Sequence, residues 1–187
     1  MFTIYNAALL KSLPFENPRQ IVHVHTRNLA EGWDRRGLFY EDFLEYRAQA
    51  RSFEGLAAFR DYYGFRIRDE RGVPHLTDGC LVTPNTFSLI GQKPLLGRDF
   101  RADDAMPEAN KVTILSYGLW QTQYGGDPSI VGATFFIEGR PFTVAGVTPP
   151  GFFGETLRGD PPDLFIPLQQ EPLINGDTSL LRQPISA

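Results

Sequence analysis

Proline and glycine interrupt this chain at short intervals, and this feature limits its fold more than any other. Fifteen Pro and eighteen Gly are spread over 187 residues. This spacing predicts many turns between short elements rather than a bundle of long helices. The length suits one domain or two small lobes, and a hydrophobic content of 42% is enough to form a core.

The first half of the chain predicts a strand, a helix and a hairpin. Residues 21–25 alternate between apolar and polar side chains, as in a strand. Apolar residues over 39–53 recur every three or four positions, which predicts an amphipathic helix that Gly55 ends. Alternation returns over 65–82 and is broken by the polar turn 69–72, which predicts a β-hairpin.

The second half predicts two short helices, a second hairpin and two further strands. Thr83 caps one helix that ends at Gly91, and Ser116 caps another that ends at Gly125–Gly126. Strands are expected at 112–115, 134–137, 142–145 and 164–166, with a polar, irregular tail after Leu168. The order lacks the regular alternation of a doubly wound sheet. We therefore expect an α+β fold, with mixed, mostly antiparallel short strands and hairpins and a few amphipathic helices.

The first ten residues, MFTIYNAALL, are apolar but do not form a signal peptide. They lack a basic start and a cleavage site of small residues. They are also far shorter than the ~20 apolar residues that span a bilayer. Composition leaves two interpretations open: a short buried or interfacial segment, or the end of a membrane helix.

Charge and cysteine content exclude two classes of protein. A formal net charge of −4 provides no long-range attraction for phosphate backbones, so nucleic acid is not an expected partner. Cys80 is the single cysteine, so no disulfide can form within the chain. We expect Cys80 to be a small buried hydrophobic residue on a strand rather than a reactive thiol.

Two histidines and an acidic cluster are the candidates for metal ligands. His23 and His25 would share one face of a strand, but zinc needs further ligands, so solvent-facing positions on an edge strand are the preferred interpretation. Asp99, Asp103 and Asp104 do not follow the spacing of a calcium loop. A solvated loop with local arginine pairing, in which one Asp caps a helix, is expected instead.

Catalytic and phosphate-binding motifs are also weak. Ser116 follows a strand and precedes a helix, but it lacks the preceding Gly of a nucleophile elbow, and no histidine follows it. The glycines of 125–128 and Gly132 are not followed by the Lys and Ser or Thr of a phosphate loop. We therefore predict no catalytic, cofactor-binding or metal-binding residues, and no cofactor.

Runs of glycine, proline and aromatic residues occur in a characteristic order. They are VTPNTF at 82–87, Ile90-Gly91, Pro94, LGRDF at 96–100, Asp103-Asp104, VTILSYGLW at 112–120, YGGDP at 124–128, IVG at 130–132, GRPFTV at 139–144, VTPPGF at 147–152 and DLFIPL at 163–168. Upstream lie LLKSLPF at 9–15, YEDF at 40–43 and RSFEGLAAF at 51–59. Together they resemble the V-S-P-N-Y-F … G … P … L-G-R-x-F pattern, and its continuation, of the MacB-like periplasmic core domain in permeases of the MacB/FtsX superfamily.

The resemblance implies a non-catalytic domain of an ABC-type export or mechanotransmission permease. It would face the periplasm from the cell inner membrane and couple motion of the membrane helices to a substrate or partner outside. Implied partners are the flanking transmembrane helices of the same permease, a separate cytoplasmic ATPase subunit, and a periplasmic adaptor or a second permease copy. The orphan type that lacks an attached ATPase domain, common in acidobacteria, looks most similar.

The resemblance also predicts the domain boundaries. Residues 1–20 are expected to be the end of a truncated first transmembrane helix with its juxtamembrane segment. Residues 21–187 are expected to be the periplasmic core domain, incomplete at its C-terminus. Two alternatives differ in class: a free-standing periplasmic binding module for a peptide, glycan or lipid, and a hydrolase that uses acidic residues such as Asp99 and Asp103.

Overall fold

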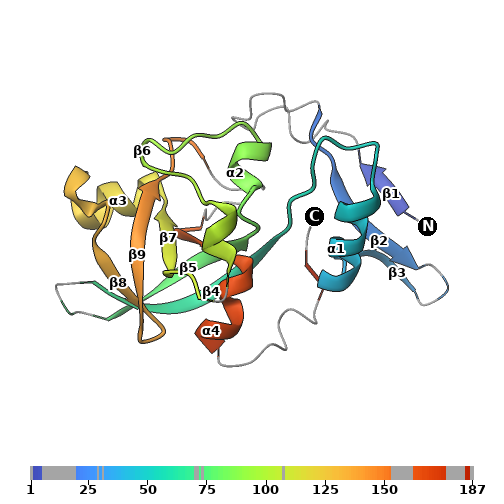
Figure 1. Cartoon of the computed structure of the whole chain (residues 1–187). Coiled ribbons are helices and arrows are strands. Elements are labelled where there is room, and N and C mark those ends of the chain that lie inside the picture. Colours follow the sequence, from blue (N-terminus) through green and yellow to red (C-terminus); the bar gives the residue numbers. More distant parts are fainter. Residues whose placement is uncertain are drawn as a thin grey trace.

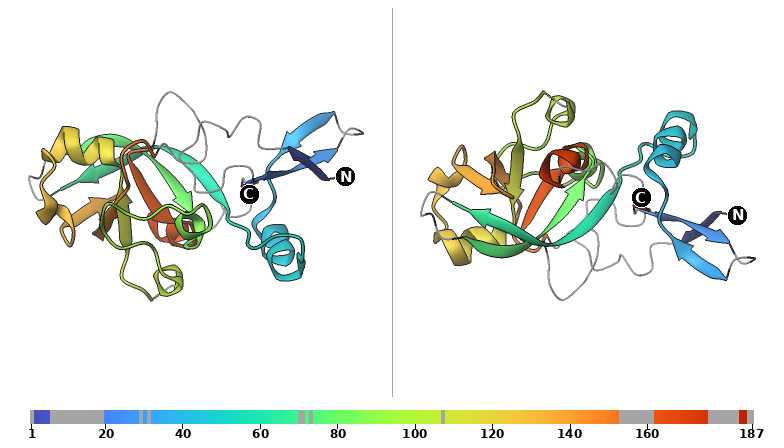
Figure 2. Two further views of the ribbon diagram at one scale, coloured as in Figure 1. Left: turned by 90° about the horizontal axis from the view of Figure 1, so that it is seen from above. Right: turned by 90° about the horizontal axis from the view of Figure 1, so that it is seen from below.

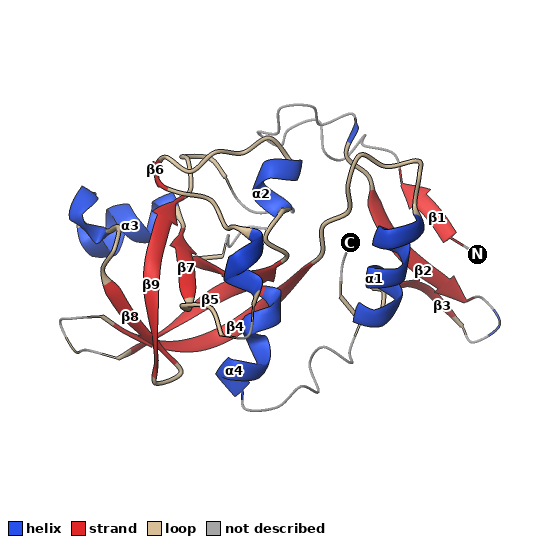
Figure 3. Ribbon diagram, viewed as in Figure 1, coloured by secondary structure: helices blue, strands red, loops and turns tan. Residues whose placement is uncertain are grey.

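The computed structural model describes residues 2–5, 20–28, 30, 32–69, 72, 74–106, 108–152, 162–175 and 184–185. These residues form two parts: a small sheet with one helix, and a larger sheet with several short helices (Figure 1). The views from above and below place the two parts at opposite ends of the molecule (Figure 2). Short strands and short helices are mixed along the chain (Figure 3), which confirms the predicted α+β class.

The small sheet has three strands in the order β1-β2-β3, and both pairings are antiparallel. The helix α1 (Tyr40–Gln49) follows it, with acidic residues in the first turn and Arg47 in the last, as the helix dipole favours. Its Phe43 is fully buried. The strands are β1 (Phe2–Tyr5), β2 (His23–Asn28) and β3 (Trp33–Arg36).

The larger sheet closes on itself. Its order is β6-β9-β7-β10-β5-β4-β8, and β8 also pairs with β9, so six strands form a closed ring to which β6 is added. Two neighbouring pairs, β5 with β10 and β7 with β9, are parallel and the others are antiparallel. The prediction of mixed, mostly antiparallel strands is therefore confirmed. The strands are β4 (Phe59–Arg68), β5 (His75–Val82), β6 (Leu96–Gly97), β7 (Val112–Leu115), β8 (Thr134–Ile137), β9 (Arg140–Val147) and β10 (Leu164–Pro167).

Both expected hairpins are present. β4 and β5 pair from Phe59 opposite Val82 to Ile67 opposite His75, and β8 and β9 pair across Glu138 and Gly139. Glu138 has φ 47° and Gly139 has φ 76°, the two positive values that a tight two-residue hairpin turn requires. The Glu138 carboxylate also accepts hydrogen bonds from the backbone N–H and the guanidinium of Arg66 on β4. The turn is thereby fastened to the neighbouring strand.

Short helices fill the connections between the strands. α2 begins at Thr86, later than the predicted cap at Thr83, while the predicted helix after Ser116 is confirmed. The tail after Leu168 was expected to be irregular, and over residues 168–175 this was wrong, because these residues form helical turns that bury apolar side chains such as Ile174. Residues 176–183 lie outside the described residues. The helices are α2 (Thr86–Leu89), η4 (Ala102–Ala105), α3 (Tyr117–Tyr124), η5 (Pro128–Ile130), η6 (Leu168–Gln170) and α4 (Glu171–Asn175).

The closed ring of six strands is called the barrel. Its strands have apolar side chains on both faces, so they separate two hydrophobic clusters. Along β10, Leu164 and Ile166 belong to the larger one, called the inner cluster, which also contains Phe65 and Ile67 of β4 and Phe43 of α1. Phe165 points the opposite way, into an aromatic cluster beneath α2. Its rings pack in tilted or edge-on contacts with centroids 5.3–5.9 Å apart. The four phenylalanines are Phe87, Phe100, Phe152 and Phe165.

Two boundary expectations differ from the structure. α1 ends at Gln49, because Ala50 already has an extended backbone, so the helix does not continue to Gly55. At the N-terminus, Phe2–Tyr5 form a strand that pairs with β2, whereas a helix end was expected. Residues 6–19 lie outside the described residues, so the membrane segment at 1–20 stays a prediction. None of the helices within the described ranges is long and apolar enough to cross a bilayer.

Candidate functional site

The two histidines considered for zinc lie in the small sheet. β2 is its central strand, so the expected edge position was wrong. The solvent-facing position is confirmed for His23, which is exposed, and wrong for His25, which is buried. The ring of His23 packs against Phe59 of β4, with centroids 5.6 Å apart. Across the described part of the chain, no three His, Cys, Asp or Glu side chains gather in a group that could hold a metal ion.

The other candidate residues for catalysis or phosphate binding have structural roles. Ser116 Oγ accepts the backbone N–H of Leu119 at 3.0 Å, as an N-cap does. Gly125, at φ 61°, ends α3 in the left-handed conformation, so the glycine run is a helix stop. Cys80 is fully buried on β5, as predicted. Trp120 is buried, and its indole N–H donates to the Asp127 carbonyl.

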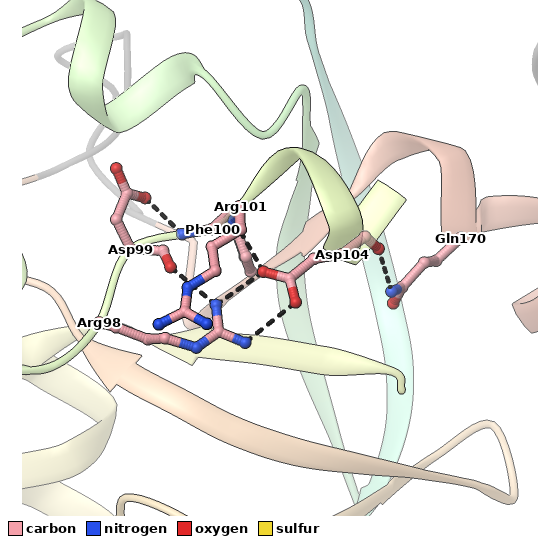
Figure 4. Close-up of polar contacts among 6 residues, drawn as sticks. All are labelled: Arg98, Asp99, Phe100, Arg101, Asp104 and Gln170. Carbon is pink, nitrogen blue, oxygen red and sulfur yellow. Dashed lines mark hydrogen bonds and ion pairs between the residues drawn. The ribbon is translucent and has the colours of Figure 1, made fainter. Parts of the chain in front are cut away.

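The acidic cluster belongs to the segment Arg98–Asp104, which follows β6 and runs into η4 and is called here the Arg98–Asp104 loop. Arg98 donates two hydrogen bonds to the Asp104 carboxylate, at 2.7 and 2.9 Å. The backbone N–H of Arg101 donates a third, at 2.7 Å. All three meet on Asp104 in Figure 4. Arginine pairing and helix capping were both expected, but Asp104 is buried rather than solvated.

Glycine is required where this loop begins. Gly97 has φ 72°, and a Cβ at this position would collide with the backbone of Ala145 and Gly146 on β9. The backbone N–H of Arg98 donates to the Ala145 carbonyl at 2.9 Å. The L-G-R sequence thus places the arginine directly after a close approach of two strands.

Two carboxyl groups of the loop, the buried Asp104 and the partly buried Asp99, have pKa values shifted in opposite directions. Burial would raise the pKa of Asp104, but hydrogen bonds from Arg98 and from the Arg101 backbone, with the positive charges of both, hold it below its ordinary value. Burial raises the pKa of Asp99 to about 6, against the opposing effects of its hydrogen bond from the Phe100 backbone and of Arg98. Asp104 therefore stays ionised to lower pH than an ordinary aspartate, whereas Asp99 takes up its proton at about pH 6.

The loop is tied to the segment that follows β10. Gln170 of η6 is buried, and its Nε2 donates to the backbone carbonyl of Asp104 at 2.7 Å (Figure 4). The preceding residue, Gln169, donates from its Nε2 to the hydroxyl of Tyr40 on α1 at 3.1 Å. η6 therefore contacts the Arg98–Asp104 loop through Gln170 and α1 through Gln169.

The linker between α1 and β4 is anchored as well. The backbone N–H of Ala58 donates to Thr83 Oγ1 at 3.0 Å, and the backbone N–H of Thr83 donates to the Ala58 carbonyl at 2.8 Å. Asn85 Nδ2 donates to the Leu56 carbonyl at 2.9 Å. Thr83 and Asn85 belong to the VTPNTF sequence, so this sequence holds the linker in place as well as starting α2.

A further pairing lies immediately before α1. Leu38 and Ile185 exchange two backbone hydrogen bonds, of 2.7 and 2.8 Å. Gly37 lies so close to Ile185 that a Cβ on it would collide with the backbone there. Leu38, Phe43 and Ile185 share the inner cluster with Leu168 of η6. We call the η6 contacts, the anchored linker and this pairing together the junction.

The geometry of the Arg98–Asp104 loop and the junction favours a structural role over a catalytic one. Both oxygens of the Asp104 carboxylate are engaged by donors, which leaves it poorly suited to accept a proton from a substrate. Sequence reasoning found the arginine and the aspartates but missed Tyr40, Gln169 and Gln170. The available signal was a pair of glutamines that follows a buried apolar strand after one leucine.

A comparison with protein families identifies the family of the chain. The model of the MacB-like periplasmic core domain matches residues 1–182. The chain belongs to this family. The sequence-based identification is thus confirmed, and the chain is a MacB-like periplasmic core domain of the kind found in ABC-type permeases.

Solved structures share the fold. The periplasmic region of MacB from Actinobacillus actinomycetemcomitans is 16% identical with a TM-score of 0.64, and the match covers 87% of this chain and 70% of that one. The extracellular domain of the noncanonic ABC-type transporter YknZ from Gram-positive bacteria is 14% identical with a TM-score of 0.60, over 80% and 72%. A domain of a putative permease from Porphyromonas gingivalis is 19% identical with a TM-score of 0.58, over 82% and 68%. No curated protein matches the chain.

Proposed function

We propose that this chain is the extracytoplasmic domain of an ABC-type export or mechanotransmission permease. It couples movement of membrane helices to a periplasmic substrate or partner and catalyses no reaction. The family match over residues 1–182 carries this proposal. The fully engaged Asp104 and the N-cap role of Ser116 support it, because both residues are committed to structure.

Mechanical coupling requires that the two parts of the domain move together, and the junction supplies this. The linker residues Leu56 and Ala58 are bonded to residues of the α2 region, and Tyr40 is bonded to η6. Phe43 of α1 is fully buried in the inner cluster that it shares with barrel strands. A displacement applied to the small sheet and α1 would therefore be passed to the barrel rather than absorbed in a loose linker.

The proposal places the domain at the cell inner membrane, facing the periplasm. Of residues 1–20, Phe2–Tyr5 form β1 and are therefore not part of a membrane helix; the remainder is proposed to hold the helix end and the juxtamembrane segment. Residues 21–187 belong to the periplasmic core domain. The partners are the flanking helices of the same permease, a separate cytoplasmic ATPase subunit as in the orphan type, and a periplasmic adaptor or a second permease copy.

Fractionation of native cells tests this assignment. An antibody raised against the chain should detect a protein much larger than 21.0 kDa in the inner-membrane fraction. Added protease should cut it only after the outer membrane has been opened. A soluble protein of about the chain's own mass would contradict the proposal, and would favour the free-standing binding module.

Co-purification tests the partner. The permease, solubilised in detergent and captured through this domain, should bring down a cytoplasmic ATPase subunit. Its ATP hydrolysis should fall when Asp104→Ala loosens the Arg98–Asp104 loop, whereas Leu76→Ala, at a residue 70% exposed on β5, should leave it unchanged. Unchanged hydrolysis in the Asp104 variant, with the complex intact, would count against coupling through this domain.

A further inference from the structure

η6 stands between the barrel and α1 and has a contact on each side. It follows β10 without any intervening residue, and β10 is bonded to β5 on one side and β7 on the other. Leu168, the first residue of η6, is fully buried in the inner cluster. This short element therefore cannot shift without disturbing the middle of the barrel.

On the barrel side, the contact is a backbone carbonyl held by a buried amide. Gln170 Nε2 donates to the Asp104 carbonyl at 2.7 Å, and only 1% of Gln170 is exposed. The carboxylate of the same Asp104 organises the loop through Arg98 and Arg101. Gln170 thus binds the loop at Asp104, the residue that also accepts the hydrogen bonds from Arg98 and Arg101 (Figure 4).

On the α1 side, the contact is a side-chain hydrogen bond between residues 129 positions apart. Gln169 Nε2 donates to Tyr40 Oη at 3.1 Å. Tyr40 is the first residue of α1, and its ring stacks on that of Phe43, with centroids 6.2 Å apart. The Tyr40 hydroxyl therefore moves with the first turn of α1, and its hydrogen bond to Gln169 links that movement to η6.

We propose that η6 is a two-sided bracket that couples the position of α1 to the order of the Arg98–Asp104 loop. The inference rests on the proposed function and deepens it, because it names the route by which movement at α1 reaches the barrel surface. Since the coupling is energetic, it acts in both directions: loosening either contact loosens the element on the far side.

Hydrogen exchange on the 187-residue chain tests the route from α1 to the loop. Tyr40→Phe removes the hydroxyl but keeps the ring, and it should speed exchange of the backbone amides of Arg101 and Asp104 about threefold to fivefold, the equivalent of one net hydrogen bond. The matched control is Tyr117→Phe on α3, whose ring packs on Trp120 rather than on η6. The control should leave these amides unchanged.

The reverse variant tests the route from the loop to α1. Gln170→Leu removes the donor to Asp104 and should speed exchange of the α1 amides of residues 43–50 by a similar factor. If this buried variant does not fold, Arg98→Lys takes its place, because it weakens the loop through the Asp104 ion pair at a partly exposed side chain, and it should speed exchange of the same α1 amides.

Faster exchange confined to the mutated side would overturn the bracket. In that outcome the two glutamines would be independent local contacts. These measurements need neither membrane nor ATPase, so their failure would leave the permease assignment standing. A soluble native protein in the fractionation experiment would instead remove the assignment while the bracket survived.

Discussion

At the scale of single residues, the Arg98–Asp104 loop contains two carboxyl groups with opposite energetic effects. Asp104 accepts three charge-assisted or backbone hydrogen bonds and stabilises the fold when ionised. Asp99 has one short hydrogen bond, from the Phe100 backbone at 2.6 Å, and its burial makes ionisation unfavourable. Neighbouring acids of the same type therefore contribute to stability in different pH ranges.

Asp104→Ala should destabilise the chain by about 2–4 kcal/mol, because it leaves the Arg98 guanidinium and the Arg101 amide without their acceptor. Denaturant unfolding of the two chains at neutral pH gives the difference. Asp103→Ala, one residue earlier and exposed, is the matched control and should change stability by less than about 0.5 kcal/mol. Equal losses from both variants would show that the Asp104 contacts contribute little.

Asp99→Asn should remove a pH dependence. The folded-state pKa of about 6 exceeds the ordinary value of 3.8, so the folded chain binds the proton more tightly between those values, and stability falls as pH rises through that interval. Asparagine keeps the acceptor for Phe100 and carries no charge, so the variant should be more stable at pH 7, on the order of 1 kcal/mol after allowance for solvent screening. Thermal unfolding from pH 4 to 7 measures this, and parallel curves for the two chains would refute it.

At the scale of elements, α3 and the two hairpins depend on local signals. α3 begins at a serine cap and ends at a left-handed glycine, and each hairpin turns through polar or glycine residues. Local elements of this kind form independently of the remaining topology. Their stability should therefore respond to changes at their ends more than to changes elsewhere on the surface.

Ser116→Ala should cost about 1 kcal/mol, because the Leu119 N–H loses its acceptor at the start of α3. Ser116→Asp, which restores an acceptor at the same position, should recover most of the loss. Chemical denaturation of the three chains measures both effects. A Ser116→Asp chain as unstable as Ser116→Ala would show that packing rather than capping accounts for the serine.

The dependence of these elements on local signals explains how much of the fold the sequence predicts. The hairpins, the strand Val112–Leu115 and α3 follow from periodicity and capping residues a few positions apart. Closure of the barrel, the insertion of β10 between β5 and β7, and the Gln169–Tyr40 contact join residues far apart in the chain, and no local pattern encodes them. The family resemblance indicated the Arg98–Asp104 loop but gave no role to Gln170.

At the scale of the whole molecule, the two parts share one core. Phe43 of α1 lies in the same cluster as Phe65, Ile67 and Leu164 of the barrel. Elements that bury one another's apolar surface unfold together, so the described residues should behave as a single cooperative unit.

Phe43→Ala should therefore lower the free energy of unfolding of the entire chain by about 3–5 kcal/mol. Near-ultraviolet and far-ultraviolet circular dichroism should still report one coincident transition. Leu76→Ala, at an exposed position on β5, is the control and should shift it by less than about 0.5 kcal/mol. Separate transitions in the wild-type chain, or a Phe43 variant that loosens α1 alone, would show that the small sheet and the barrel unfold independently.

The position of β10 has a consequence for biosynthesis. It is the last of the barrel strands to be translated, yet it lies between β5, which ends at Val82, and β7, which ends at Leu115, well before β10 begins at Leu164. Until residue 167 leaves the ribosome, those two strands present unpaired backbone edges toward each other. Nascent chains with such edges are prone to mispairing and aggregation. The barrel can therefore close only late in synthesis. A factor that kept β5 and β7 from pairing with other strands until β10 emerges would protect the nascent chain from aggregation.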